Sequence, residues 1–471
     1  MPKHLFHGDA AKITFRTDPF SNGQCLSIDG KVVGGVTTIF AAGYGSPNQG
    51  TPANPPNRAN VYGSPVWKTT DLGEHWEPCT APFDLAGSTS LDNEVELVVV
   101  SGSGRLHAFA MQSGTGAFYA YSDDDGATWV SPSLPGNGPL DQNPAGHTSW
   151  PTIPTVIGVL HDLPGMPAGM LVAYGHGASA VAVSMDDGAT WSCSASDVFG
   201  GSFNSFSGAS AAAYVSGRII VVGAPGGSPG SSSGNYTVMY SDDNGATWTT
   251  PATDPFYNDA HTVGSAVSGV TGLLIATAQM KGSGGSLPHS IALSADNGVT
   301  WTYPTSADPP DRPLVALTLD ATHAVIGCGS AGPWFTTDGG VTWTAAPLDD
   351  AGNPVTTFQT ALVVNSNGVV MMAGNGTTGT SLTSPPFAMS HDQGATWVYP
   401  DRDPTDNGQL NTAKALGALF LLTANGGGST MFSGESGATC SISSDDGVHW
   451  TRLFTNPQDF FSGIGVTVDF V

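Results

Sequence analysis

Residues 241–248 read Ser-Asp-Asp-Asn-Gly-Ala-Thr-Trp, and this octapeptide decides the fold because the chain repeats its pattern eight times. The pattern is Ser/Thr-x-Asp-x-Gly-x-x-Trp, and each copy is called a box below. The boxes occupy residues 69–76, 122–129, 184–191, 241–248, 294–301, 336–343, 390–397 and 443–450. Self-similarity at an interval of about 50 residues is the sequence signature of solenoids, propellers and related arrays.

Each box contains the residue types that a tight turn between two β-strands needs. The Asp is expected to accept a hydrogen bond from the backbone N–H two residues on, and the Gly to adopt a positive φ. The Trp is expected on the following strand, with its ring buried. Because these residues recur together at fixed offsets, a structural turn is favoured over a ring of catalytic or metal-binding carboxylates. The aspartates concerned are Asp71, Asp124, Asp186, Asp243, Asp296, Asp338, Asp392 and Asp445.

Between the boxes, short apolar runs bounded by Gly, Pro, Ser and Asn predict β-strands and almost no helix. The mean box interval of about 53 residues suits four short strands and their turns, as in a propeller blade. We therefore predict one all-β domain over residues 1–471: a single β-propeller of eight four-stranded blades, with seven blades as the alternative. The final apolar run, residues 464–471, is predicted to pair with the N-terminal blade and close the ring. Residues 43–60, rich in Gly, Pro and Asn, predict a long loop.

The repeated pattern resembles the Asp box (BNR repeat) of the sialidase-type β-propeller superfamily, which also includes xyloglucanase-type glycosidases and sortilin-type receptors. The resemblance spans residues 69–450. It implies that each box lies between the third and fourth strands of a blade, on the face away from an active site. Sialidases also carry an arginine triad and an Arg-Ile-Pro motif. Here residues 15–19 read Phe-Arg-Thr-Asp-Pro, and the seven arginines show no family spacing, which disfavours sialidase activity.

Composition excludes several classes of partner. The formal net charge is −25, from 38 acidic and 13 basic residues, whereas nucleic-acid binding needs a basic footprint. No run approaches the roughly 20 apolar residues of a membrane span, so no membrane insertion is expected. The N-terminus lacks an apolar signal region, which predicts a protein made in a cytoplasm. The five cysteines are widely spaced and are expected to be buried free thiols.

Candidate functional residues lie in the segments that follow each box Trp, where propeller loops meet the central channel. A glycosidase needs two carboxylates placed across a sugar, about 5 Å apart or wider. The catalytic candidates are Asp92, Glu94, Asp259 and His261. Many other acid pairs meet the same requirement, and solvated loop acids that cap turns are the favoured alternative.

Aromatic and basic residues in the same segments are candidates for ligand contact. Trp150 is the one Trp predicted in a connection between blades, where it stacks on a sugar or seals the loop. The ligand-binding candidates are Trp150, His147, Tyr257 and Arg312. No cofactor is expected. Ca²⁺ is the alternative, with Asp401, Asp403 and Asp406 as the candidate ligands because hard cations prefer several oxygen ligands.

The leading hypothesis is a non-catalytic recognition or structural propeller that contacts a cell-surface glycan or a protein partner. Similar Asp-box propellers without a secretion signal occur in phage tails and tail tips, which favours incorporation into a virion among other virion proteins, with oligomeric assembly. The alternative is a glycoside hydrolase of the Asp-box propeller type that acts on a neutral polysaccharide.

Overall fold

The structure, a computed structural model, describes most of the chain between residues 24 and 455. The described ranges are 24–44, 65–83, 95–112, 116–133, 139–141, 155–176, 180–193, 198–199, 208–224, 236–256, 262–280, 289–309, 313–328, 332–346, 358–375, 387–398, 409–425 and 438–455. No described helix is long and apolar enough to cross a membrane.

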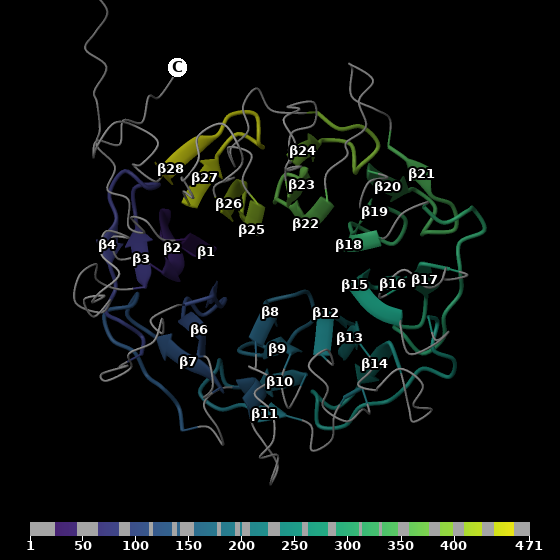
Figure 1. The fold of residues 1–471 in the computed structure, drawn as a ribbon, viewed down its shortest axis with the longest axis horizontal. Helices are drawn as coiled ribbons and strands as arrows, with labels where there is room; N and C mark the ends of the chain where they lie inside the picture. Colours follow the sequence, from purple (N-terminus) through teal and green to yellow (C-terminus); the bar gives the residue numbers. More distant parts are fainter. Residues whose placement is uncertain are drawn as a thin grey trace, which may run out of the picture.

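The described strands form eight antiparallel groups that follow one another along the chain and lie in sequence order around a common centre (Figure 1). Groups one to four contain β1 (Gln24–Val33), β2 (Val36–Tyr44), β3 (Val66–Thr69) and β4 (Glu77–Pro78); β5 (Leu97–Val100), β6 (Leu106–Gln112) and β7 (Gly116–Ser122); β8 (Thr155–His161), β9 (Leu171–His176), β10 (Val181–Ser184) and β11 (Ser192–Cys193); β12 (Gly208–Val215), β13 (Arg218–Ala224) and β14 (Val238–Ser241). Groups five to eight contain β15 (Thr262–Val270), β16 (Leu273–Met280) and β17 (Ile291–Ser294); β18 (Pro313–Thr318), β19 (Ala324–Cys328), β20 (Gly332–Thr336) and β21 (Thr344–Ala345); β22 (Phe358–Val364), β23 (Val370–Asn375) and β24 (Phe387–Ser390); β25 (Gln409–Leu416), β26 (Leu419–Asn425), β27 (Ala438–Ser443) and β28 (Thr451–Thr455).

The expectation of an all-β chain is confirmed, because the only helical element among the described residues is the short 3-10 turn η2 (Pro139–Asp141). In every group the third strand ends on the first residue of a box, so each box joins the third strand to the fourth. The group sheets remain separate except that β9 and β12 share one pair, His176 with Gly208.

The predicted fourth strand is complete in only half of the groups. It forms β4, β11, β21 and β28, whereas among the described residues of groups two, four, five and seven it is a single bridge just after the box. Each of these four groups has a proline three residues after the box Trp, at positions 132, 251, 304 and 400. Proline has no N–H for the ladder, and this accounts for the short fourth strand.

The first strands face the centre of the ring and share a local irregularity. Seven of them carry a β-bulge close to their start, whereas β5, the shortest, shows none over its described residues. A bulge bends a strand and re-aims its side chains. Asn411 Nδ2, at the bulge of β25, donates to the Cys25 carbonyl at 2.8 Å, and Thr412 Oγ1 donates to the Leu26 carbonyl at 2.9 Å. Side chains of the last group therefore bond the backbone of the first.

Apolar clusters fill the seams, by which we mean the contacts between consecutive groups. Trp191 of the third box packs edge-on against Tyr119 of the second group, with ring centroids 5.3 Å apart. In the same way, Trp76 of the first box shares a buried cluster with Leu421 and Leu453 of the eighth group. The first and last groups are thus in contact through the same kind of seam. The predicted pairing strand, residues 464–471, lies outside the described residues, as do residues 45–60 of the predicted loop.

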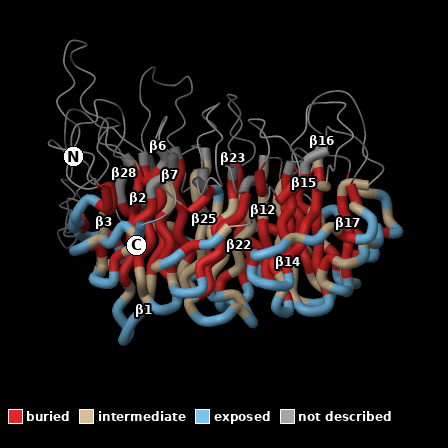
Figure 2. The backbone as a smooth tube through the Cα atoms, turned by 90° about the horizontal axis from the view of Figure 1, so that it is seen from below, coloured by how far each residue is buried: buried red, intermediate tan, exposed pale blue. Residues whose placement is uncertain are grey.

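The boxes and the turns between first and second strands lie at one edge of the ring, because the strands within a group alternate in direction. This edge, the box face, carries the exposed turns along the lower side of Figure 2, and the buried strands rise above it. Second strands end, and first strands begin, at the opposite edge. The cores of the sheets lie between these two faces.

Candidate functional site

Each box turn is organised around the hydroxyl of its first residue. In the second box, Ser122 Oγ donates to Asp124 Oδ1 at 2.8 Å and accepts from the Gly126 N–H at 2.8 Å. Asp124 Oδ1 also accepts from the Thr128 N–H at 2.8 Å. The equivalent Gly N–H bonds span 2.7 to 3.0 Å across all eight boxes. The turn role is confirmed, but the predicted bond was wrong in detail: the Asp accepts from the N–H four residues on.

Two consecutive residues of each box adopt the left-handed region. The glycines have φ between 79° and 95°, as predicted, and the residues before them have φ between 55° and 72°. Asp, Asn or Gly occupies this fourth box position in six boxes, where their tolerance of positive φ suits them. Leu72 and Gln393 stand there in the other two, and Leu72 is also 40% exposed.

The box carboxylates are held in their ionised form. Burial alone would raise their pKa values, but hydrogen bonds from the seventh box residue and the leading hydroxyl lower them in the first box and in the third to eighth. For Asp124, the bond from the Thr128 hydroxyl makes the largest contribution to a pKa of about 2. A carboxylate of this kind is a poor general acid near neutral pH.

The richest polar cluster among the described residues lies on the seam between groups two and three. Arg105, at the start of β6, binds Asp123 through Nε at 2.7 Å and Nη2 at 3.1 Å. Its Nη1 donates to the Asp187 carbonyl at 2.7 Å, and its guanidinium lies 4.1 Å from the centre of the Tyr121 ring. Arg105 therefore fixes the turn of the third box against the second group.

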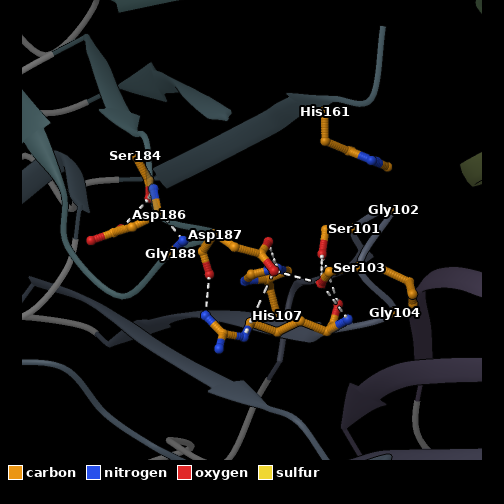
Figure 3. Close-up of polar contacts among 12 residues, drawn as sticks. Ser101, Gly102, Ser103, Gly104, His107, His161, Ser184, Asp186, Asp187 and Gly188 are labelled. Carbon is orange, nitrogen blue, oxygen red and sulfur yellow. Dashed lines mark hydrogen bonds and ion pairs between the residues drawn. The ribbon is translucent and has the colours of Figure 1, made fainter. Parts of the chain in front are cut away.

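Beneath Arg105, a buried histidine connects three elements (Figure 3). His107 is fully buried; its Nδ1 lies 2.9 Å from the Tyr119 hydroxyl and its Nε2 lies 3.3 Å from Asp187 Oδ1. Asp187 Oδ2 accepts from Ser103 Oγ at 2.5 Å. Burial alone would raise the pKa of Asp187, but hydrogen bonds from His107, Ser103 and Ser101 lower it to about 2.

The fourth group repeats the arginine but not the histidine. Arg218 binds Asp242 at 2.6 and 3.0 Å, lies 4.2 Å from the centre of the Tyr240 ring, and donates to the Asn297 carbonyl at 2.9 Å. Strand register places Ile220 where His107 stands, and Val238 where Tyr119 stands. Asn297 replaces Asp187 at the fourth box position. The arginine clamp is thus a repeated structural device, and the polar set beneath it occurs at the seam of groups two and three.

The arrangement of Ser103, Asp187 and His107 does not suit nucleophilic catalysis. A catalytic triad needs the serine hydroxyl bonded to the histidine, with the carboxylate behind it. Here the serine bonds the carboxylate instead, and a carboxylate with a pKa of about 2 is a weak base. Because His107 is fully buried, it cannot contact a substrate. The geometry therefore supports a role in joining the groups.

Two acids that follow boxes four and five also have structural partners. Asp254 accepts from the Thr237 N–H at 2.5 Å and from its hydroxyl at 2.6 Å. Asp308 binds the Ser290 N–H in the same manner. Each carboxylate caps the backbone ahead of a third strand. These contacts agree with the expectation that loop acids cap turns, for these two residues.

One exposed group of potential metal ligands lies on the first box. Ligand atoms of Asp71, Glu74 and His75 lie within 4.8 Å of one another. All three residues are exposed, and Asp71 already bonds His75 Nδ1 at 2.6 Å within the turn. The group therefore resembles the other box turns, with His75 in place of the threonine of boxes two to seven, as His449 is in the eighth box.

The candidate residues derived from the sequence all lie outside the described residues. These are Asp92, Glu94, His147, Trp150, Tyr257, Asp259, His261, Arg312, Asp401, Asp403 and Asp406. The cluster around His107 escaped the sequence analysis because its members are dispersed in sequence. The available signal was the pair of similar segments Arg105-Leu106-His107 and Arg218-Ile219-Ile220. Both begin with Arg, but the residue two positions after the Arg is ionisable only in the first segment.

Comparison with known proteins supports the repeat assignment. The BNR/Asp-box repeat family model matches residues 239–250, which contain the fourth box. No curated protein matches the chain.

Among solved structures, the chain is similar to YCF48 from Cyanidioschyzon merolae, at 14% identity over 75% of this chain and 93% of that one, with a TM-score of 0.43. It is also similar to the GH74 xyloglucanase from Xanthomonas campestris, at 15% identity over 88% and 64%, with a TM-score of 0.37. The GH74 enzyme from Niastella koreensis is 13% identical over 90% and 68%, with a TM-score of 0.26. A shared fold does not imply a shared activity. By its own repeats and the arrangement of its sheets, this chain is an all-β protein whose strand groups follow one another around a common centre and which carries the BNR/Asp-box repeat at residues 239–250.

Proposed function

We propose that the protein is a non-catalytic recognition or structural propeller that holds the loops opposite its box face against a glycan or protein partner. The observation that carries this proposal is the use of the box carboxylates: each is bonded within its own turn. A glycosidase needs one carboxyl group that stays protonated near neutral pH and a second across the bound sugar. The box carboxylates, with lowered pKa values, do not meet the first requirement.

The body that displays these loops is proposed to be a closed ring of eight blades. Eight boxes, eight strand groups and the apolar seam between the first and last groups support this number over seven. Closure of a sheet array removes exposed edges that would otherwise pair with other chains. A rigid ring also suits recognition, because it fixes the relative positions of loops that are far apart in sequence.

A panel of neutral and sialylated polysaccharides, immobilised and free, tests the proposed function. We expect retention of the protein on at least one immobilised glycan, with no reducing sugar released above background. Trp150→Ala should weaken that retention because it removes an aromatic platform, whereas Glu74→Gln, an exposed change on the box face, should leave it unchanged. Release of reducing sugar by the purified protein would contradict the non-catalytic assignment and favour a glycoside hydrolase.

We further propose that the ring is incorporated into a phage virion, at the tail or tail tip, after synthesis in a cytoplasm. The acidic composition, with a formal net charge of −25, supports this assignment. Negative-stain electron microscopy of the purified chain tests it, with rings stacked into larger particles as the expected result. Discrete monomers at all concentrations would contradict assembly and leave the recognition proposal standing.

A further inference from the structure

We propose that the seam between groups two and three is sensitive to acid. The closed seam, with the two groups in contact, is stable while His107 is neutral, and it opens when the imidazole ring gains a second proton. The proposal rests on the complete burial of His107 between Asp187 and Tyr119. Asp187 Oδ1 lies 3.3 Å from His107 Nε2, and an imidazole lone pair facing a carboxylate would be repelled, so we assign the hydrogen of the neutral ring to Nε2. Nδ1 of the neutral ring is then an acceptor, and the Tyr119 hydroxyl donates to it at 2.9 Å.

A second proton on the ring would reverse one of these bonds. Protonated Nδ1 is a donor, so Tyr119 would have to accept from it and direct its own hydrogen elsewhere. Gly188 of the third box packs closely against both side chains: a Cβ added to Gly188 would overlap the Tyr119 hydroxyl oxygen and come within 3.1 Å of His107 Cε1. Acid would therefore place a charge on a fully buried imidazole and require its bond to Tyr119 to reverse, and both changes oppose the closed seam.

Charges of both signs lie near the imidazole ring. Asp187, from the third box, favours the imidazolium, whereas Arg105, directly before β6, and His161, at the end of β8, disfavour it. Tyr119, on β7, is neutral and held so by burial, which raises its pKa. Burial of His107 makes the largest contribution, and the pKa of His107 is lowered overall.

The direction of the pH effect follows from this lowered pKa. Below about pH 6.5, the usual value for histidine, the unfolded or opened chain binds a proton that the closed seam excludes. The equilibrium constant for opening therefore increases as the pH falls, by up to about tenfold per pH unit, until the pH reaches the lowered value. Above pH 6.5 this contribution is constant.

The seam between groups four and five supplies a matched control within the chain. The triple variant His107→Ile, Tyr119→Val, Asp187→Asn gives the seam between groups two and three the residues of this control seam, which are Ile220, Val238 and Asn297. Urea unfolding at pH 7.5 and 5.5 is the measurement. We expect the unfolding constant of the natural chain to rise more between these pH values than that of the triple variant, by up to about tenfold. An equal pH dependence in both proteins would overturn the proposal.

A local measurement on the natural chain keeps the test independent of the variant's folding. Amide hydrogen exchange, corrected for intrinsic rates, compares residues 180–193 with residues 289–302. We expect protection of the first segment to fall relative to the second, by up to about tenfold, when the pH is lowered from 7.5 to 5.5. A constant ratio of the two protections would contradict an acid-sensitive seam, whatever the propeller binds.

Discussion

Gly188→Ala is expected to destabilise the protein by about 3 kcal/mol or more, enough to prevent folding of a marginally stable chain. Two effects combine at this position. Gly188 has φ 81°, and a side chain in the left-handed region costs about 1–2 kcal/mol. The added Cβ would also overlap the Tyr119 hydroxyl oxygen across the seam, which adds the cost of overpacking a buried contact. Urea unfolding monitored by circular dichroism measures the sum.

Gly217→Ala separates the two contributions. Gly217 has φ 88°, but an added Cβ there meets nothing within 4 Å. Its substitution should therefore cost only the backbone contribution of about 1–2 kcal/mol. Equal losses of stability for the two variants would show that box glycines are needed for backbone conformation alone. They would also show that close packing of the boxes against the preceding group does not require glycine.

Trp76→Ala is expected to lose about 3–5 kcal/mol of stability, the usual cost of removing a large buried ring. Trp76 is only 7% exposed, and its cluster joins Ile28 and Ile39 of the first group to Leu421 and Leu453 of the last. No described strand pairing joins these two groups, so their contact depends on side chains. Thermal or urea unfolding of the variant measures the strength of this closing seam.

Trp191→Ala is the matched control, because Trp191 is also 7% exposed but lies at an internal seam. In a closed ring the two substitutions should cost similar free energies. If the first and last groups were apart in solution, Trp76 would be solvated and its loss would cost well under 1 kcal/mol, while Trp191→Ala would still cost several. The difference between the two variants therefore reports ring closure.

The sequence predicts the local parts of this fold well because the hydrogen bonds of each box turn join residues of the same octapeptide. The hydroxyl, carboxylate and glycine of one turn lie within eight residues, so a single sequence reveals their bonds. The shortened fourth strands were also readable in hindsight, since Pro132, Pro251 and Pro304 follow their boxes at a constant offset. Even so, the partner of the Asp bond was predicted wrongly, because the leading hydroxyl accepts from the Gly N–H two residues after the Asp.

The seams could not be predicted in this way because they join residues far apart in the chain. His107 and Asp187 meet only after two groups have folded and docked, and neither belongs to a short motif that requires the other. The contact of Trp76 with Leu421 depends on completion of the whole ring. The sequence-based candidates for ligand contact lie outside the described residues and stay predictions.

Amide hydrogen exchange at the eight box glycines tests the central claim most directly: that the boxes are equivalent structural turns of one closed ring. The glycine amides donate to the leading hydroxyl of each box at 2.7 to 3.0 Å. At neutral pH we predict that all eight exchange slowly and with similar protection, including Gly73 and Gly447 at the closing groups. Rapid exchange at Gly73 alone, or protection of box amides that appears only when a ligand is added, would contradict this account.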